Sequence, residues 1–279
     1  MTCCSVTKLI DIFEGIFTMF NRVRGPESFP DGVSPRDSGA ELPLELRELL
    51  EEQPVSSAAA AEAAESDWPV SIYVPAHYEE NYAYPLVVWF HDSGCHEGQV
   101  EPVIGAISRQ NYCGLGIQGN LALNDGVSFG WNTELLEYGT IPLRDLLGVT
   151  IRRLRQAFHI HSERIFLAGS GAGADVALNQ LSLMPDWYAG AVLFSPDCQQ
   201  SVVEGLAACS MSNKSLLWTV SRTASSEHLA HNVEAVQLIR LAGAEPDVRV
   251  TDSVLDPESS DVRFVDHWLL SKLATESYV

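Results

Sequence analysis

The sequence has few basic residues and no long hydrophobic run. Its 279 residues include 17 Lys and Arg against 37 Asp and Glu, a net charge of −20, and only three residues are lysines. Such an acidic surface repels phosphate backbones and anionic lipids, so we expect neither nucleic acid nor a membrane surface as a partner. No apolar run approaches the ~18 residues of a transmembrane helix, so we expect no transmembrane segment.

The six cysteines include no C-x-x-C pair, and their spacing suits neither zinc nor a disulfide framework. This usage favours free thiols in a reducing compartment. The N-terminus also lacks a basic region followed by an uninterrupted apolar stretch, because Lys8, Asp11 and Glu14 interrupt it. A secretory signal is therefore not expected, and the sequence predicts a cytoplasmic protein.

The chain divides into three parts. Residues 1–23 contain an amphipathic helix over 6–23, which we expect to dock on the folded domain, with a protein partner as the alternative. Residues 24–66 contain five prolines and a Ser/Ala-rich run, which is typical of a flexible acidic linker. Residues 67–279 form the folded domain.

Apolar segments typical of strands alternate with helical patterns from residue 67 onward. This alternation predicts the α/β class, with a parallel sheet covered by helices on both faces. The apolar run PLVVWF at 85–90 is typical of a strand buried on both faces. The strands are expected at 70–74, 85–90, 113–118, 164–168, 191–194, 216–220 and 248–250. The helices are expected at 98–109, 141–158, 172–184, 227–242 and 261–273.

The segment IFLAGSGAGADVAL at 165–178 reads as strand, tight glycine turn and helix. Two kinds of site use that layout. One is a nucleophile elbow, which presents a side chain above the sheet. The other is a dinucleotide-binding turn, formally matched by Gly169, Gly171 and Ala174. The second needs an acidic residue that closes the next strand, and the nearest, Asp197, lies beyond the end of that strand.

Three segments carry a resemblance to a known family: YPLVVWFHDSG at 84–94, SERIFLAGSGAG at 162–173 and the helical segment at 236–243. Over about 69–275 the domain resembles the phospholipase/carboxylesterase family of α/β hydrolases, which includes acyl-protein thioesterase-like enzymes. The resemblance implies an α/β-hydrolase fold and a serine-dependent hydrolysis of carboxylic esters.

The resemblance breaks down at the residues that would carry the reaction. The family's nucleophilic serine falls on Gly171, and Ser170 stands one place early. The family's His-Gly pair becomes His91-Asp92. By the resemblance, Asp92 and Ala172 are the oxyanion-hole positions, where a carboxylate would oppose the developing negative charge.

The acid and the histidine of the family are not matched either. The acid is expected within 221–226 and the histidine within 251–257, and neither segment holds that residue. A rebuilt triad would use Ser170 as nucleophile with a displaced base and acid, an arrangement that sequence order alone does not exclude. The candidates are the bases His228, His231 and His267 and the acids Glu227 and Asp256.

Other polar residues follow the strand at 85–90. His91, Asp92, His96 and Glu97 are metal-ligand types, but the interpretation as loop residues is favoured, and no metal or cofactor is expected. His91 and Trp131 are pocket candidates, and Trp131 is equally well explained as a core anchor.

The sequence is compatible with three functions. The favoured one is a catalytically degenerate hydrolase that binds a small molecule, an ester or a protein. The alternatives are an active ester hydrolase using Ser170 and a dinucleotide-binding protein at 169–174.

Overall fold

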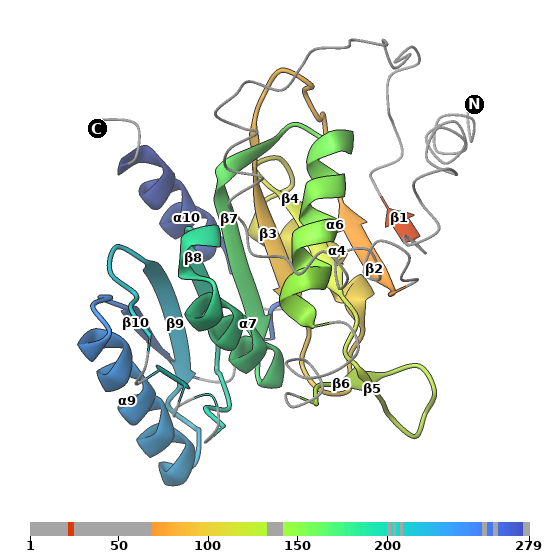
Figure 1. The fold of residues 1–279 in the computed structure, drawn as a ribbon. Coiled ribbons are helices and arrows are strands. Elements are labelled where there is room, and N and C mark those ends of the chain that lie inside the picture. The colour runs from red at the N-terminus through yellow and green to blue at the C-terminus, as the bar shows by residue number, and fades with distance from the viewer. Residues whose placement is uncertain are drawn as a thin grey trace.

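The computed structural model describes residues 22–24, 68–132, 142–199, 202, 205–206, 209–252, 256–258 and 262–275. An eight-stranded sheet of order β1-β2-β4-β3-β7-β8-β9-β10 forms the centre of the fold (Figure 1). Its strands are β1 (Arg22–Arg24), β2 (Val70–Tyr73), β3 (Tyr84–Phe90), β4 (Cys113–Ile117), β7 (Ile160–Ser170), β8 (Gly190–Phe194), β9 (Ser215–Ser221) and β10 (Asp247–Thr251).

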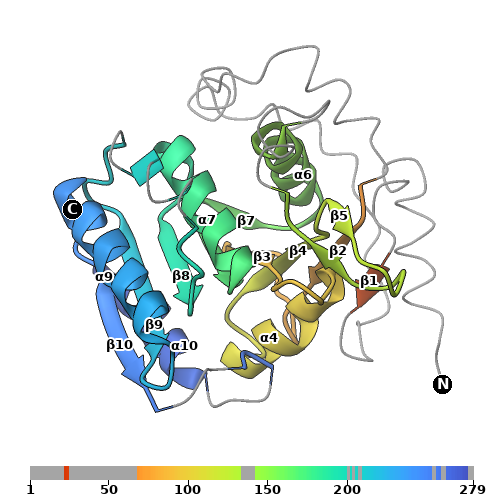
Figure 2. The same cartoon turned by 90° about the horizontal axis from the view of Figure 1, so that it is seen from below.

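Helices cover both faces of this sheet, as predicted. Figure 2 shows α6, α7 and α9 on one face and α4 and α10 on the other. The helices are α4 (Val100–Ile107), α6 (Leu143–Ala157), α7 (Ala172–Leu183), α9 (Ser226–Leu241) and α10 (Arg263–Thr275), with the short 3-10 helices η1 (Glu97–Gln99) and η2 (Pro185–Trp187).

The sheet is mostly parallel, with one exception that the sequence did not indicate. β2 runs antiparallel to β4, whereas the other paired strands of this sheet run parallel. The segment between β2 and β3 contains no helix. A parallel arrangement of consecutive strands needs a crossover, usually helical, so the short β2–β3 connection suits the reversed direction.

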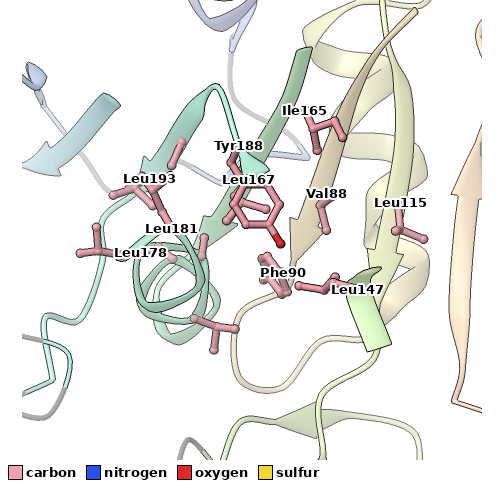
Figure 3. Close-up of a cluster of buried hydrophobic side chains, with 14 of the residues drawn as sticks. Val88, Phe90, Leu115, Leu147, Ile165, Leu167, Leu178, Leu181, Tyr188 and Leu193 are labelled. Atoms are coloured by element: carbon pink, nitrogen blue, oxygen red, sulfur yellow. The ribbon is translucent and has the colours of Figure 1, made fainter. Parts of the chain in front are cut away.

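Strand β3 divides the hydrophobic core into two layers. Leu86, Val88 and Phe90 face the layer that includes residues of α6, α7 and α9 (Figure 3). Val87 and Trp89 face the layer that includes residues of α4 and α10. All seven residues of β3 are buried, as the continuous apolar run predicted.

Several boundaries differ from the sequence prediction. β7 is eleven residues long and begins at Ile160, well before the expected strand at 164–168. The loop after β4 holds a small hairpin of β5 (Leu121–Ala122) and β6 (Phe129–Gly130). Of the segment expected as a helix over 6–23, Arg22 and Val23 belong to strand β1, and 6–21 lie outside the described residues, as does the predicted linker beyond Arg24.

The longest described helix, α9, has 16 residues. None of them is both long and apolar enough to cross a bilayer.

A substitution at Leu167 tests how much the core layer under α7 contributes to the stability of the fold. Its side chain is fully buried in β7, so Leu167→Ala leaves a cavity and should lower the free energy of unfolding by about 2–5 kcal/mol. Leu121→Ala in the exposed β5 is the matched control and should change it by less than about 0.5 kcal/mol. Urea titration of both variants measures the difference, and equal effects would contradict this core assignment.

Candidate functional site at the turn between β7 and α7

The turn from β7 into α7 has the geometry of a nucleophile elbow. β7 ends at Ser170, α7 begins at Ala172, and Gly171 between them has φ 52° and ψ −121°. This is a backbone conformation that side-chain-bearing residues adopt only with strain. Gly171 therefore occupies the tip of the turn, as the alignment of the motif predicted, and Ser170 lies within the sheet, in register with Phe194.

Two more glycines let the helix approach the sheet closely. A Cβ on Gly169 would collide with the backbone of Gly173, and a Cβ on Gly173 would collide with the carbonyls of Phe90 and His91. The glycines of this segment are therefore required by the packing of α7 on β7 and β3. This requirement explains the glycine pattern without a bound dinucleotide.

The carboxylate of Asp92 lies directly over Gly171. A Cβ built on Gly171 would overlap all three carboxyl atoms of Asp92. Asp92 Oδ1 accepts hydrogen bonds from the backbone N–H of Ser93 at 2.7 Å and of Ala172 at 3.2 Å. The two sequence-predicted oxyanion positions, Asp92 and Ala172, are thus in contact, with an acidic side chain bound to the backbone donor. Its charge at the N-terminus of α7 would also repel a pyrophosphate.

His91 is held in one neutral tautomer beside this carboxylate. Its Nε2 accepts a hydrogen bond from Gly119 N–H at 2.9 Å, and its Nδ1 donates to the Asp92 carbonyl at 2.8 Å. Burial lowers the pKa of His91 to about 4, so the ring is uncharged near neutral pH. Both nitrogens are engaged by backbone, which suits a positioning role for the β3 loop and leaves neither free to act as a base.

Trp131 packs on the same loop. Its Nε1 donates to the His91 carbonyl at 2.8 Å, and its ring lies 5.0 Å from the His91 ring and 5.7 Å from that of Phe90, centroid to centroid. The half-buried ring packs against the core layer under α6 and α7. These contacts support the interpretation of Trp131 as an anchor for the segment after β6.

The histidines proposed as displaced bases are not joined to Ser170. The described residues include all eight histidines, and among them no hydrogen bond connects an imidazole to the Ser170 hydroxyl. His267 in α10 bonds to the Arg263 carbonyl at 3.1 Å. His228 lies in the first turn of α9, where its backbone N–H bonds to the Ser225 hydroxyl, and His231 lies exposed on the same helix.

No model of a known protein family matches this chain, and no curated protein matches it in sequence. Solved structures do match. A carboxylesterase from Bacillus cereus matches with a TM-score of 0.59 and 15% identity, over 77% of this chain and 100% of that one. A carboxylesterase from Mesorhizobium loti matches with a TM-score of 0.52 and 18% identity, over 68% of this chain and 90% of that one. An esterase structure from Rhizomucor miehei matches with a TM-score of 0.50 and 12% identity, over 86% of this chain and 93% of that one.

The chain has the α/β-hydrolase fold. At these identities the likeness establishes the architecture and leaves the activity to the residues of the site. In an α/β hydrolase the oxyanion hole uses the N–H of the residue after the nucleophile and an N–H from the loop after the third strand. Here the N–H of Ala172, which follows Gly171, binds the Asp92 carboxylate, and so does the N–H of Ser93 in the loop after β3.

The regions that hold the acid and the histidine in an α/β-hydrolase triad contain other pairs here. After β9, the hydroxyls of Ser221 and Thr223 bond to each other at 2.8 Å. Arg222 then forms an exposed ion pair with Asp252, at 3.3 Å from Nη1 to Oδ1, across the ends of β9 and β10. The ion pair connects the two loops, and neither of these pairs includes a histidine.

Asp175 is a residue of this site that sequence analysis missed. It lies fully buried in the first turn of α7, where its carboxylate accepts the N–H groups of Cys198 at 2.9 Å and Gln199 at 2.8 Å. Burial nevertheless raises the pKa of Asp175 to about 6. The only hint in the sequence is an isolated acid within the small-residue run after Gly171.

Asp197 follows β8 beside the same turn. Partial burial raises its pKa, the charge of Asp92 raises it further, and the nearby His228 lowers it. Three carboxyls, those of Asp92, Asp175 and Asp197, therefore lie near one elbow. Within the described parts of the chain, no three Cys, His, Asp or Glu side chains are arranged to hold a metal ion, including those around His91 and His96.

A double-mutant cycle tests the fit between Gly171 and Asp92. Gly171→Ala should destabilise the fold by about 1–3 kcal/mol through backbone strain, plus the cost of displacing the carboxylate. The second part should vanish in an Asp92→Ala background, which predicts a coupling of about 0.5–3 kcal/mol in urea unfolding. Gly105→Ala in α4, where a Cβ has open space, is the control and should be neutral or stabilising. Additive effects would contradict the overlap.

The raised pKa of Asp175 predicts that the free energy of unfolding depends on pH in an unusual direction. Its folded pKa is above the unfolded value, so the folded state binds the proton more tightly, and the ionised group costs stability as pH rises from about 4 through 6. The free energy of unfolding of the wild-type chain should therefore fall relative to Asp175→Asn across that range, by roughly 2–3 kcal/mol. Urea titrations of the wild-type chain and of Asp175→Asn at pH 4, 5, 6 and 7 measure this difference in the free energy of unfolding. The contributions of the other titrating groups, which both chains share, cancel in it. A difference that stays flat or rises with pH would refute the assignment.

Proposed function

We propose that this protein is a phospholipase/carboxylesterase-like α/β-hydrolase homologue that has lost ester hydrolysis at its elbow and acts as a binding or scaffolding protein. The observation that carries the proposal is the Asp92 carboxylate, bound to the Ala172 N–H and placed over the side-chain-free Gly171.

Serine-dependent hydrolysis needs a nucleophile, a base within hydrogen-bond reach and donors for the oxyanion. Gly171 has no side chain to attack a carbonyl. The backbone donors that would stabilise the oxyanion already bind a carboxylate. An ester carbonyl brought to this point would develop negative charge beside Asp92, which raises the barrier where an active enzyme lowers it.

The same features limit what the protein binds. The acidic groups around the elbow favour a neutral or cationic small molecule over a phosphorylated one. The four cysteines within the described residues are free thiols, in keeping with a reducing compartment. The cytoplasmic location and a protein partner on residues 6–23 remain predictions from the sequence.

Covalent labelling with a fluorophosphonate probe tests the proposal, read as the intact mass of the full chain. We expect no adduct on the wild-type chain under conditions that label an active carboxylesterase completely. Covalent labelling is more decisive than turnover, because α/β-hydrolase-like binding and oxyanion contacts alone leave about 10³–10⁴-fold acceleration over water.

Ser170→Ala separates the remaining outcomes. A one-probe adduct that this variant loses would mean that Ser170 is an activated nucleophile, and the proposal would be wrong. An adduct that the variant keeps would place a nucleophile elsewhere and would equally refute it. Thr150→Ala, another buried hydroxyl outside the turn, is the matched control for the loss of a hydroxyl group.

A further inference from the structure

The segment from the end of α6 into the first half of β7 concentrates positive charge in an acidic chain. Residues 152–164 include four of the fourteen arginines and a single acidic residue, which gives a formal charge of +3 against −20 for the whole chain. α6 ends at Ala157 and β7 begins at Ile160, so this segment lies at the end of β7 opposite to the β7–α7 turn (Figure 1). The four arginines are Arg152, Arg153, Arg155 and Arg164.

The last turns of α6 bring like charges together. Arg152 and Arg155 are three residues apart on the helix, a spacing at which like charges repel. The residues three or four places from Arg155 include no acid; they are Ile151, Arg152, Phe158 and His159. The C-terminal end of a helix carries about half a negative charge, which compensates part of one guanidinium and leaves the helix end positive.

Strand β7 contains a bulge beside this helix end. Tyr84 of β3 pairs with Ile160 and Leu86 pairs with Ile165, so β7 advances five residues where β3 advances two. The residues between, His161–Arg164, are therefore released from regular pairing with β3. Bulges of this kind redirect side chains and are common next to functional sites.

The charges of α6 and β7 act on one histidine ring. His161 Nδ1 accepts a hydrogen bond from the Glu163 N–H at 3.2 Å, which leaves the proton of the neutral ring on Nε2. Burial lowers the pKa of His161, and the charge of Arg164 lowers it further. Glu163 raises it, whereas Arg155 and His159 lower it. Arg155 of α6 and Arg164 of β7 are thus both near the His161 ring.

The guanidiniums of Arg155 and Arg164 have no anionic partner in the part of the chain that the structure describes. Both side chains are half-buried, and no hydrogen bond or ion pair joins either of them to a carboxylate there. The Nε atom of Arg164 is buried and has no hydrogen-bond partner among those residues. Burial also lowers the pKa of Arg155. A bound anion would stabilise both the buried donor and the desolvated cation.

The loop between the two elements is held by a tyrosine. Tyr78 Oη accepts the N–H of His159 at 2.6 Å, and His159 Nδ1 donates to the Glu80 carbonyl at 2.9 Å. The Tyr78 ring stacks on Tyr84 and lies edge-on to Phe158. The backbone between α6 and β7 is therefore fixed before any ligand binds, which favours binding.

We propose that Arg155, Arg164 and His161 bind a phosphate group, either as the free ion or as a small phosphate monoester. A guanidinium presents paired N–H donors that match the oxygens of phosphate. Two guanidiniums match the two charges of a phosphate monoester, whereas one carboxylate would balance only one of them. The site lies away from the β7–α7 turn, so it does not depend on the function proposed for that turn.

Calorimetric titration of the full chain with inorganic phosphate tests the site. At pH 7 and a constant ionic strength of about 0.15 M, we expect a Kd on the order of 1 mM. Arg155→Gln and Arg164→Gln should each weaken binding about tenfold or more, because each removes hydrogen bonds from a charged donor. Arg144→Gln, an exposed arginine at the other end of α6, is the matched control and should leave the Kd unchanged.

The His161 ring reports where the phosphate binds. Bound phosphate should raise the pKa of His161 by about 0.5 or more, followed in proton–nitrogen spectra of the histidine rings, with His161→Gln to assign the signal. The exposed His231 of α9 is the internal control and should not change. Neither ring should respond in the R155Q/R164Q double variant. Methyl phosphate in the same titrations distinguishes the sources: a monoester site binds it at least as tightly as inorganic phosphate, and a free-ion site binds it more weakly.

Three results would overturn the proposal. They are a wild-type chain that shows neither heat nor spectral change up to about 20 mM phosphate, single variants that keep the wild-type Kd, and binding that leaves the pKa of His161 unchanged. Circular dichroism verifies that each variant is folded. If Arg164→Gln does not fold, Arg155→Gln and the His161 signal of the wild-type chain still decide the question.

Discussion

The carboxylate of Asp92 connects the two segments on which the elbow depends. One of its oxygens accepts the N–H of Ser93, in the loop after β3, and the N–H of Ala172, in the first turn of α7. Negative charge is favourable at a helix N-terminus, where backbone donors lack partners. In an active hydrolase these donors stabilise an oxyanion that exists only during the reaction. In this protein they bind a permanent group and stabilise the ground state.

This arrangement makes the two departures from the hydrolase pattern a single structural change. A side chain at position 171 would overlap the carboxylate of Asp92, so a serine there is incompatible with Asp92 in its present position. Gly171 has a positive φ at the tip of the turn, and a glycine presents no side chain there. The close packing of Gly169 and Gly173 keeps the turn sharp whatever stands at its tip. The sharp turn is therefore a feature of the packing of this fold, and the residue at its tip has no side chain.

Acidic groups make the surroundings of the β7–α7 turn negatively charged. Asp175 lies buried behind the turn and Asp197 beside it, and burial raises the pKa of both, with a further increase from the charge of Asp92. Burial holds His91, next to Asp92, neutral, and it outweighs the hydrogen bond to the Asp92 carbonyl, which raises the pKa of the ring. The neutral ring supplies no positive charge to compensate the three carboxyls. The surroundings of the turn therefore disfavour a bound anion and the development of negative charge.

The sequence by itself determined the architecture, because strands and helices depend on local patterns. The run at 85–90 predicted a strand buried on both faces, and RIFLAGSGAG predicted the strand, turn and helix that place Gly171 at the tip. The tertiary structure alone decided where Asp92, 80 residues from Ala172, directs its carboxylate, and that Asp175 is buried. It also decided that β2 runs antiparallel to β4. These features depend on contacts between distant segments, whose side-chain directions no local periodicity specifies.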